Sequence, residues 1–112
     1  VETVHYPGLS EHPDHELASH QMRAYGGVVS FVVKGGLGGA GEVLRRVRLF
    51  SLAESLGGVE SLIGQPARMS HASMPADVRR ARGVQDGLIR ASVGIEAFED
   101  LRSDLDQALT GA

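Results

Sequence analysis

Cysteine and tryptophan are absent from this chain of 112 residues, and phenylalanine and tyrosine together contribute only five residues. Without cysteine there is no disulfide bond, no thiolate nucleophile and no cysteine-based zinc site, and this composition favours a cytoplasmic protein. No apolar run approaches the roughly 20 residues of a membrane-spanning helix. The net charge of −3 comes without a basic stripe, so neither nucleic acid nor a membrane is expected as a partner.

The length and the 42% hydrophobic composition predict a single domain over residues 1–112, with a core of mainly aliphatic side chains. Strand-like and helix-like patterns alternate along the chain. The expected strands cover residues 4–6, 28–33, 66–70 and the stretch around residue 90, and the expected helices cover residues 13–24, 43–50, 75–82 (basic and exposed) and 98–109. These elements predict an α+β fold, in which helices pack on one face of a small, mainly antiparallel sheet.

The glycine-rich stretch from Gly36 to Gly41 matches the pattern G-x-G-x-x-G, which in a dinucleotide-binding fold brings backbone amides close to a pyrophosphate. That function also requires a parallel strand after the next helix. The sequence that follows, Ser55-Leu56-Gly57-Gly58, does not resemble a buried strand. A flexible turn over residues 35–41, between a strand and a helix, is therefore favoured.

Three histidines are spaced closely enough to be weighed as a metal site, namely His12, His15 and His20. His15 and His20 are five residues apart and fall on different sides of a helix. No carboxylate stands beside His12 and His15 as an obvious third ligand. A structural or surface role is favoured for these side chains, and no metal site is expected.

Residues 86–96 carry the pattern of a strand with two different faces. The residues that share the expected core face are Ile89, Ala91, Val93 and Ile95. The opposite face places the Arg90 guanidinium beside the Ser92 hydroxyl, with space left by Gly94. An arginine binds a carboxylate through two parallel charge-assisted hydrogen bonds, but an arginine is also ordinary on a solvated strand face. The pattern alone leaves both interpretations open.

The segment 54–62 places Ser55 beside the pair Gly57-Gly58. A serine next to two glycines lets the backbone pass close to a ligand and presents amide groups to it. A plain turn explains the same pattern, and these residues by themselves favour the turn.

Five motifs occur in a fixed order along the chain. They are Tyr6-Pro7-Gly8-Leu9, His12-Pro13-x-His15, the segment 52–62, Met69-Ser70-His71-Ala72-Ser73 and Leu88-Ile89-Arg90-x-Ser92-Val93-Gly94-Ile95-Glu96. In these motifs, and over essentially all of its length, the chain resembles the C-terminal domain of the Cys/Met-metabolism family of pyridoxal-phosphate (PLP) enzymes. This family contains the cystathionine γ-synthases and cystathionine γ-lyases. The resemblance implies fold type I, with residues 1–112 as the small C-terminal domain and the large PLP-binding domain absent.

The resemblance also implies roles for five residues. Arg90 would bind the α-carboxylate of the substrate. Ser55 and Leu56 would line the site, with the serine near that carboxylate and the catalytic lysine. Glu54 would lie near the distal end of the substrate and bear on the choice of reaction. Ser70 stands where many members have threonine, close to the same pocket.

PLP chemistry requires a Schiff-base lysine and a charged partner for the pyridine ring, and the family carries both in its large domain. The only lysine here, Lys34, matches no catalytic motif. The chain alone is therefore expected to hold no catalytic residue, to bind no PLP and to be inactive. In the complete enzyme, a tetramer, it would pack against its large domain. Alone it is expected to form a dimer through surface left uncovered.

Within the family, Gly58 favours the γ-synthase and γ-lyase branch, because methionine γ-lyases and homocysteine synthases tend to have aspartate at this position. The γ-synthase condenses an O-acyl-homoserine with cysteine, whereas the γ-lyase cleaves cystathionine, and this part of the enzyme does not separate them. The expected function is thus that of the C-terminal domain of a transsulfuration enzyme of cysteine and methionine metabolism. The alternative is a stand-alone amino-acid-binding or regulatory α+β module, in which Arg90 binds a free amino acid.

Overall fold

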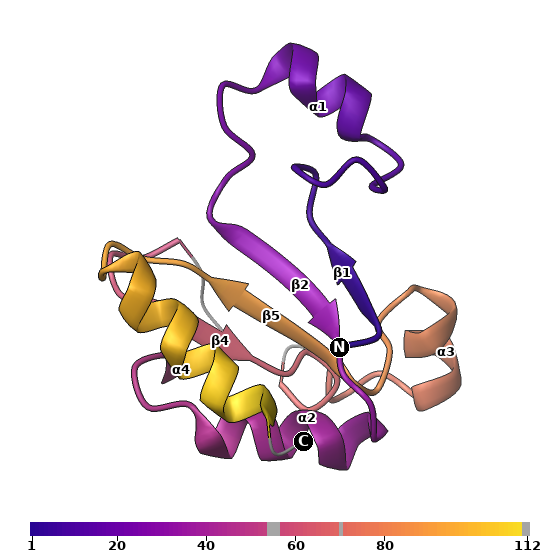
Figure 1. Ribbon diagram of the computed structural model, residues 1–112. Helices are drawn as coiled ribbons and strands as arrows, with labels where there is room; N and C mark the ends of the chain where they lie inside the picture. Colours follow the sequence, from indigo (N-terminus) through magenta and orange to yellow (C-terminus); the bar gives the residue numbers. More distant parts are fainter. Residues whose placement is uncertain (54–56, 70, 111–112) are drawn as a thin grey trace.

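A five-stranded sheet forms the centre of the described part of the chain (Figure 1). The computed structural model describes residues 1–53, 57–69 and 71–110. The strands, in their order across the sheet, are β1 (Thr3–His5), β2 (Val28–Val32), β5 (Leu88–Ser92), β4 (Leu62–Gly64) and β3 (Ser51–Leu52). All neighbouring strands are antiparallel except β3 and β4, which are parallel. The predicted α+β fold with a mainly antiparallel sheet is confirmed.

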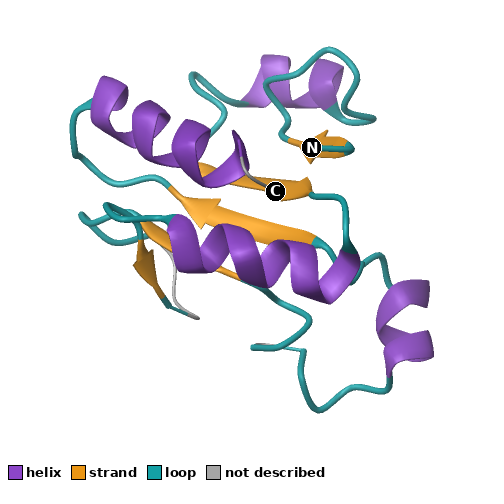
Figure 2. Cartoon of the chain, turned by 60° about the horizontal axis from the view of Figure 1, so that its bottom comes forward, coloured by secondary structure: helices purple, strands orange, loops and turns teal. Residues whose placement is uncertain are grey.

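Two long helices, α2 (Gly36–Arg46) and α4 (Phe98–Thr110), contact each other and lie along the sheet (Figure 2). Their buried faces meet the same face of the sheet. The fully buried residues at this contact are Ala40, Val43, Ile63, Ile89, Ala91 and Ala108. The shorter helices, α1 (His15–Gln21) and α3 (Ala76–Ala81), lie outside this layer, and α1 stands away from the sheet (Figure 1). No helix in the described ranges is long and apolar enough to cross a membrane.

Strand β5 has the two faces that the alternation predicts, but it is shorter than expected. Ile89 and Ala91 are fully buried against the helices, while Arg90 lies half-buried on the opposite face. The extension of the core face to Val93 and Ile95 is wrong, since Ile95 is 83% exposed. The ladder ends at Ser92, and beyond it the Ile95 N–H donates to the carbonyl of Val59 in a loop.

The glycine-rich stretch is not a turn but the beginning of α2, which starts at Gly36. Gly35, with φ of +90°, and Gly36, with φ of +61°, both have the positive φ that favours glycine, and they turn the chain into the helix. A Cβ atom on Gly39 would lie 1.9 Å from the carbonyl oxygen of Lys34. Glycine is therefore required because the first turn of α2 packs directly on the end of β2.

The predicted helix over residues 43–50 is wrong beyond Arg46, where α2 ends. The carboxylate of Asp104 in α4 accepts the N–H groups of Arg48 (2.7 Å), Leu49 (2.7 Å) and Phe50 (3.1 Å). Three successive N–H groups aimed at one carboxylate cannot also serve a helix. Burial raises the pKa of Asp104, but these hydrogen bonds outweigh burial and hold the pKa below its usual value.

The strand expected over residues 66–70 is wrong over residues 66–69, and residue 70 lies outside the described residues. The strand of this region is β4, which ends at Gly64. After it the N–H groups of Arg68 and Met69 both donate to the carbonyl of Gln65, and this bonding is that of a turn. A turn follows here because Pro66 has no N–H group to continue the ladder.

Both short helices form where they are expected, with differences in extent and exposure. Helix α1 is shorter than residues 13–24. Helix α3 follows Pro75, as predicted, but it is not exposed throughout. Arg79 is only 4% exposed, and its guanidinium pairs with the carboxylate of Asp86 at 2.6 Å. This ion pair fixes α3 to the residues that precede β5.

Substitution of Asp104 tests the contact between α4 and the loop after α2. Asp104→Ala is expected to lower the free energy of unfolding at pH 7 by about 3 kcal/mol, because buried N–H groups lose a charged acceptor. The folded-state pKa is depressed, so this stabilisation is present above the ordinary pKa of about 3.9 and is lost as the pH falls through the folded-state value. The difference in the free energy of unfolding between the wild type and Asp104→Ala should therefore become smaller at acidic pH. Denaturant unfolding at several pH values measures it, with exposed Asp106→Ala as the control; a pH-independent difference would contradict the assignment.

Candidate carboxylate-binding site

Arg90 occupies the middle of the sheet face that points away from α2 and α4. It lies between Ser30 of β2 and Gly64 of β4 in the ladder. Residues paired across neighbouring strands point to the same face. Because β5 is flanked by strands on both sides, the backbone that carries the guanidinium is fixed in position. Such a fork on a rigid element is suited to bind a carboxylate.

Gly64 brings two further segments next to Arg90. A Cβ atom on Gly64 would lie 2.8 Å from the carbonyl oxygen of Ala53 and 3.3 Å from the Sδ atom of Met69. The space that a side chain would occupy beside Arg90 is therefore filled by these two residues. The backbone of Ala53 and the side chain of Met69 therefore both reach the face of the sheet that carries Arg90.

Ser92 fixes a third segment on this face. Its hydroxyl oxygen accepts the N–H of Gly57 at 2.8 Å, and Ser92 itself is buried. Ser92 and Arg90 are two residues apart on the same strand, so their side chains leave the same face about 7 Å apart. Gly57 is thus fixed close to Arg90 as well.

Four of the five residues predicted for the site lie outside the described residues: Glu54, Ser55, Leu56 and Ser70. Arg90, the fifth, lies where the alternation of β5 predicted it. Three of the described neighbours of the other four, namely Ala53, Gly57 and Met69, lie at the sheet face that carries Arg90. Segments that are far apart in the sequence therefore meet at the sheet face that carries Arg90, through contacts with Gly64 and Ser92.

Two further residues, Ser61 and Glu96, organise this region, and the sequence analysis assigned them no role. The Ser61 N–H and hydroxyl donate to the two carboxylate oxygens of Glu96, at 3.0 Å and 2.8 Å. The same hydroxyl accepts the N–H of Gly94 at 2.8 Å. In the sequence, Ser61 lies shortly after the glycines of segment 54–62, and Glu96 lies shortly after Gly94. Only the fold brings these two polar residues into contact.

The charge of Glu96 is stabilised by this contact. The backbone N–H of Ser61, followed by its hydroxyl, holds the pKa of the Glu96 carboxyl below its usual value. Gly94 leaves the room that the contact needs, because a Cβ atom there would lie 2.2 Å from the carbonyl oxygen of Val59. The Gly57–Ser61 segment is therefore packed tightly against the residues that follow β5.

The histidines and the glycine motif offer no second site in the described part of the chain. His15 shares a hydrogen bond of 2.7 Å between its Nδ1 and the carbonyl of Pro7, and its ring stacks on Tyr25. Among residues 1–53, 57–69 and 71–110, no group of three or more histidine, aspartate or glutamate side chains is arranged to hold a metal ion. The G-x-G-x-x-G pattern lies inside α2 rather than in a loop before it.

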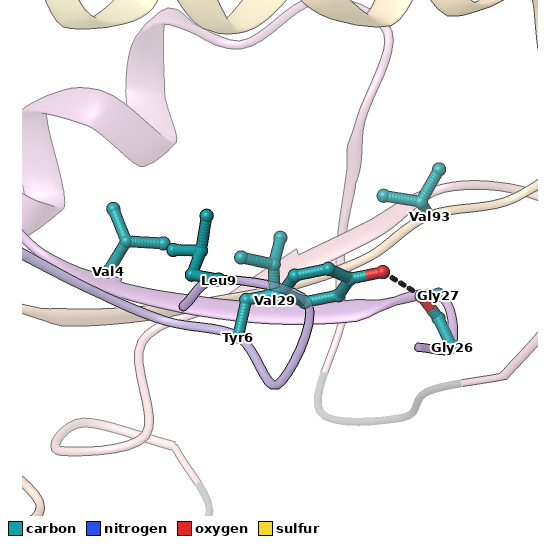
Figure 3. Close-up of a pocket in the computed structure, with 7 residues that line it drawn as sticks. All are labelled: Val4, Tyr6, Leu9, Gly26, Gly27, Val29 and Val93. Atoms are coloured by element: carbon teal, nitrogen blue, oxygen red, sulfur yellow. Dashed lines mark hydrogen bonds between the residues drawn. The ribbon is translucent and has the colours of Figure 1, made fainter. Parts of the chain in front are cut away.

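An apolar hollow lies at the other face of the sheet, beside β1 and β2 (Figure 3). Its lining residues are Val4, Tyr6, Leu9, Gly26, Gly27, Val29 and Val93. The Tyr6 hydroxyl donates to the carbonyl of Gly26 at 2.9 Å and closes one end. No charged side chain lines this hollow, so it is not suited to an amino-acid carboxylate.

Known proteins resemble this chain in sequence and in overall fold. A family model described as Cys/Met metabolism PLP-dependent enzyme matches residues 1–110. A cystathionine gamma-lyase of Dictyostelium discoideum is 55% identical over 109 residues, which cover 97% of this chain and 28% of that protein. A cystathionine beta-lyase of Coxiella burnetii is 56% identical over the same shares of the two chains.

Solved structures agree with the sequence relatives. Cystathionine gamma synthase from Xanthomonas oryzae pv. oryzae, in complex with aminoacrylate and cysteine, has a TM-score of 0.91 and 49% identity, covering 98% of this chain and 28% of that one. A gamma-lyase from Micromonospora echinospora has a TM-score of 0.92 at 49% identity, over 100% of this chain and 29% of its own. The chain thus spans just over a quarter of the length of the relatives it matches.

Glycine-to-alanine substitutions test the packing around Gly94. Gly94→Ala is expected to lower the free energy of unfolding by about 1–3 kcal/mol, because the new methyl group meets backbone that cannot move freely. Gly38→Ala is the matched control: its methyl group would meet nothing within 4 Å, and it lies in α2, so it should raise stability by up to about 1 kcal/mol. Thermal unfolding compares the two, and changes of the same sign would contradict this packing.

Proposed function

The chain belongs to the Cys/Met metabolism family of PLP-dependent enzymes, and we propose on this premise that it is the small C-terminal domain of a transsulfuration enzyme, in which Arg90 binds the α-carboxylate of the amino-acid substrate. The observation that carries the proposal is the convergence of Ala53, Gly57 and Met69 on the sheet face of Arg90. Through these neighbours, Glu54, Ser55, Leu56 and Ser70 are proposed to complete the substrate side of the site.

The proposed substrate is a sulfur-containing amino acid of the cystathionine type. The relatives are named as gamma-lyases, beta-lyases and a gamma synthase, at similar identities. The motif with Gly58 favours the γ-synthase or γ-lyase reaction, and this finer assignment is part of the proposal. No described feature favours the alternative of a stand-alone amino-acid-binding module.

We propose that this chain does not hold PLP by itself. The only lysine, Lys34, is exposed at the end of β2, and its carbonyl packs against Gly39. PLP supplies the electron sink of such enzymes and requires a lysine together with a partner for the ring nitrogen. We therefore assign the cofactor to the remaining part of the complete enzyme. The part played by this chain is to bind the carboxylate and orient the amino acid.

The proposed assembly is a tetramer for the complete enzyme and a dimer for this chain alone. The physical basis for the dimer is exposed apolar surface: Val59 and Phe98 are each 72% exposed, and the hollow of Figure 3 is apolar. Apolar surface of this extent promotes association with a partner.

Arg90→Ala in the complete enzyme tests the carboxylate assignment. We expect kcat/KM for the amino-acid substrate to fall by about a hundredfold or more, because charged hydrogen bonds contribute roughly 1.5–3 kcal/mol each. Arg90→Lys should recover little, since an ammonium group cannot form the two parallel bonds. PLP content should stay near normal. Arg102→Ala, an exposed arginine on α4, is the matched control. A kcat/KM within about threefold of wild type for Arg90→Ala would exclude the assignment.

Incubation of the 112-residue chain with PLP tests whether it acts alone. After reduction with borohydride, peptide mapping should find only weak, non-saturating labelling of Lys34, because the side chain is exposed and no site surrounds it. Cystathionine should not be cleaved. Stoichiometric labelling of Lys34 accompanied by cleavage would show that the chain is an enzyme by itself.

A further inference from the structure

We propose that Ser61 and Glu96 are positioning residues, which set the distance between the Gly57–Ser61 segment and the strand that carries Arg90 and thereby control substrate affinity. This inference rests on the proposed function, because it assumes that Arg90 binds the substrate carboxylate. Neither residue is proposed to touch the substrate.

Two hydrogen bonds join Ser61 to Glu96. Both oxygens of the Glu96 carboxylate are occupied by Ser61, and the Ser61 hydroxyl also accepts the N–H of Gly94. The Ser61 carbonyl accepts the N–H of Ser51 at 2.9 Å, so the same residue is tied to β3. Ser61 is completely buried, and a buried polar group that lacks a hydrogen-bond partner is destabilising. The segment therefore has one favoured position relative to the end of β5.

The sheet itself does not need this contact. Strand β5 pairs with β2 over residues 88–92 and with β4 over residues 90–92, and its buried residues pack on α2 and α4. Glu96 lies four residues beyond the end of that ladder. Loss of the Glu96 carboxylate therefore leaves the backbone of Arg90 in place. The Gly57–Ser61 segment then keeps the bond from Gly57 to Ser92 and the bond from the Ile95 N–H to the Val59 carbonyl, but it loses both bonds from Ser61 to Glu96, so its position is less closely determined.

The consequence for the substrate is a change in affinity rather than in chemistry. A segment that is fixed before binding costs no conformational entropy when the substrate arrives, whereas a loosened segment must be ordered at that moment. This cost applies to the bound ground state and to the transition state alike. Loss of the Ser61–Glu96 pair is therefore expected to raise KM with little change in kcat.

The test is a double-mutant cycle in the complete enzyme with L-cystathionine as the substrate. Glu96→Ala should raise KM by about tenfold and leave kcat within about threefold of wild type. Glu96→Gln should have a smaller effect, because the amide oxygen can still accept the Ser61 N–H. Val43→Ala, a core truncation in α2 remote from this contact, controls for lost stability and should leave KM within about twofold. If Glu96→Ala does not fold, Glu96→Gln serves in the cycle.

The second arm of the cycle distinguishes this inference from the function on which it rests. Combined with Arg90→Ala, the Glu96 substitution should lower kcat/KM by less than about twofold further, since the site that it positions is already lost. Full additivity, or an unchanged KM in Glu96→Ala, would overturn the positioning role while leaving the role of Arg90 intact. An Arg90→Ala variant that keeps its kcat/KM would overturn both.

Discussion

A single buried serine, Ser61, fixes the end of the sheet at which the candidate site lies. Its carbonyl accepts the N–H of Ser51, its hydroxyl accepts the N–H of Gly94, and its two donors bind the Glu96 carboxylate. A completely buried residue must satisfy all of these groups within the protein, so the strand ends and the loop can meet in only one arrangement. The geometry around Arg90 depends on that arrangement.

The two faces of the sheet serve different purposes. One face packs on α2 and α4, and the Asp104 carboxylate ties α4 to the loop after α2. The other face carries Arg90, with Gly64 leaving space for the segments beside it. Because the core holds β5 from one side, the opposite side of the same strand can bear a charged group without destabilising the fold. The central strand β5 therefore contributes side chains to the core on one face and supports Arg90 on the other.

The sequence predicted the α+β class, the strand around Arg90 and the closing helix, because each depends on a local alternation or helical period. It failed where a distant residue determines the backbone. The glycine-rich stretch looked like a turn because glycine favours turns locally, yet here Gly39 is required by its contact with Lys34. The helix expected to continue to Phe50 ends earlier, because Asp104, more than fifty residues away, binds the N–H groups of the following loop.

The sequence by itself determined the family, the two-faced pattern of β5 and the identity of Arg90 as the candidate carboxylate ligand. Residue spacing alone allowed two interpretations of Arg90, as a carboxylate ligand or as a solvated surface residue. It could not decide between them, because neighbours in space are not neighbours along the chain. The tertiary structure decided that Ala53, Gly57 and Met69 meet on the sheet face that carries Arg90. It also decided that Ser61 and Glu96 form a hydrogen bond. These contacts follow from strand order and register, which place β5 between β2 and β4, and no local pattern of residues encodes that order.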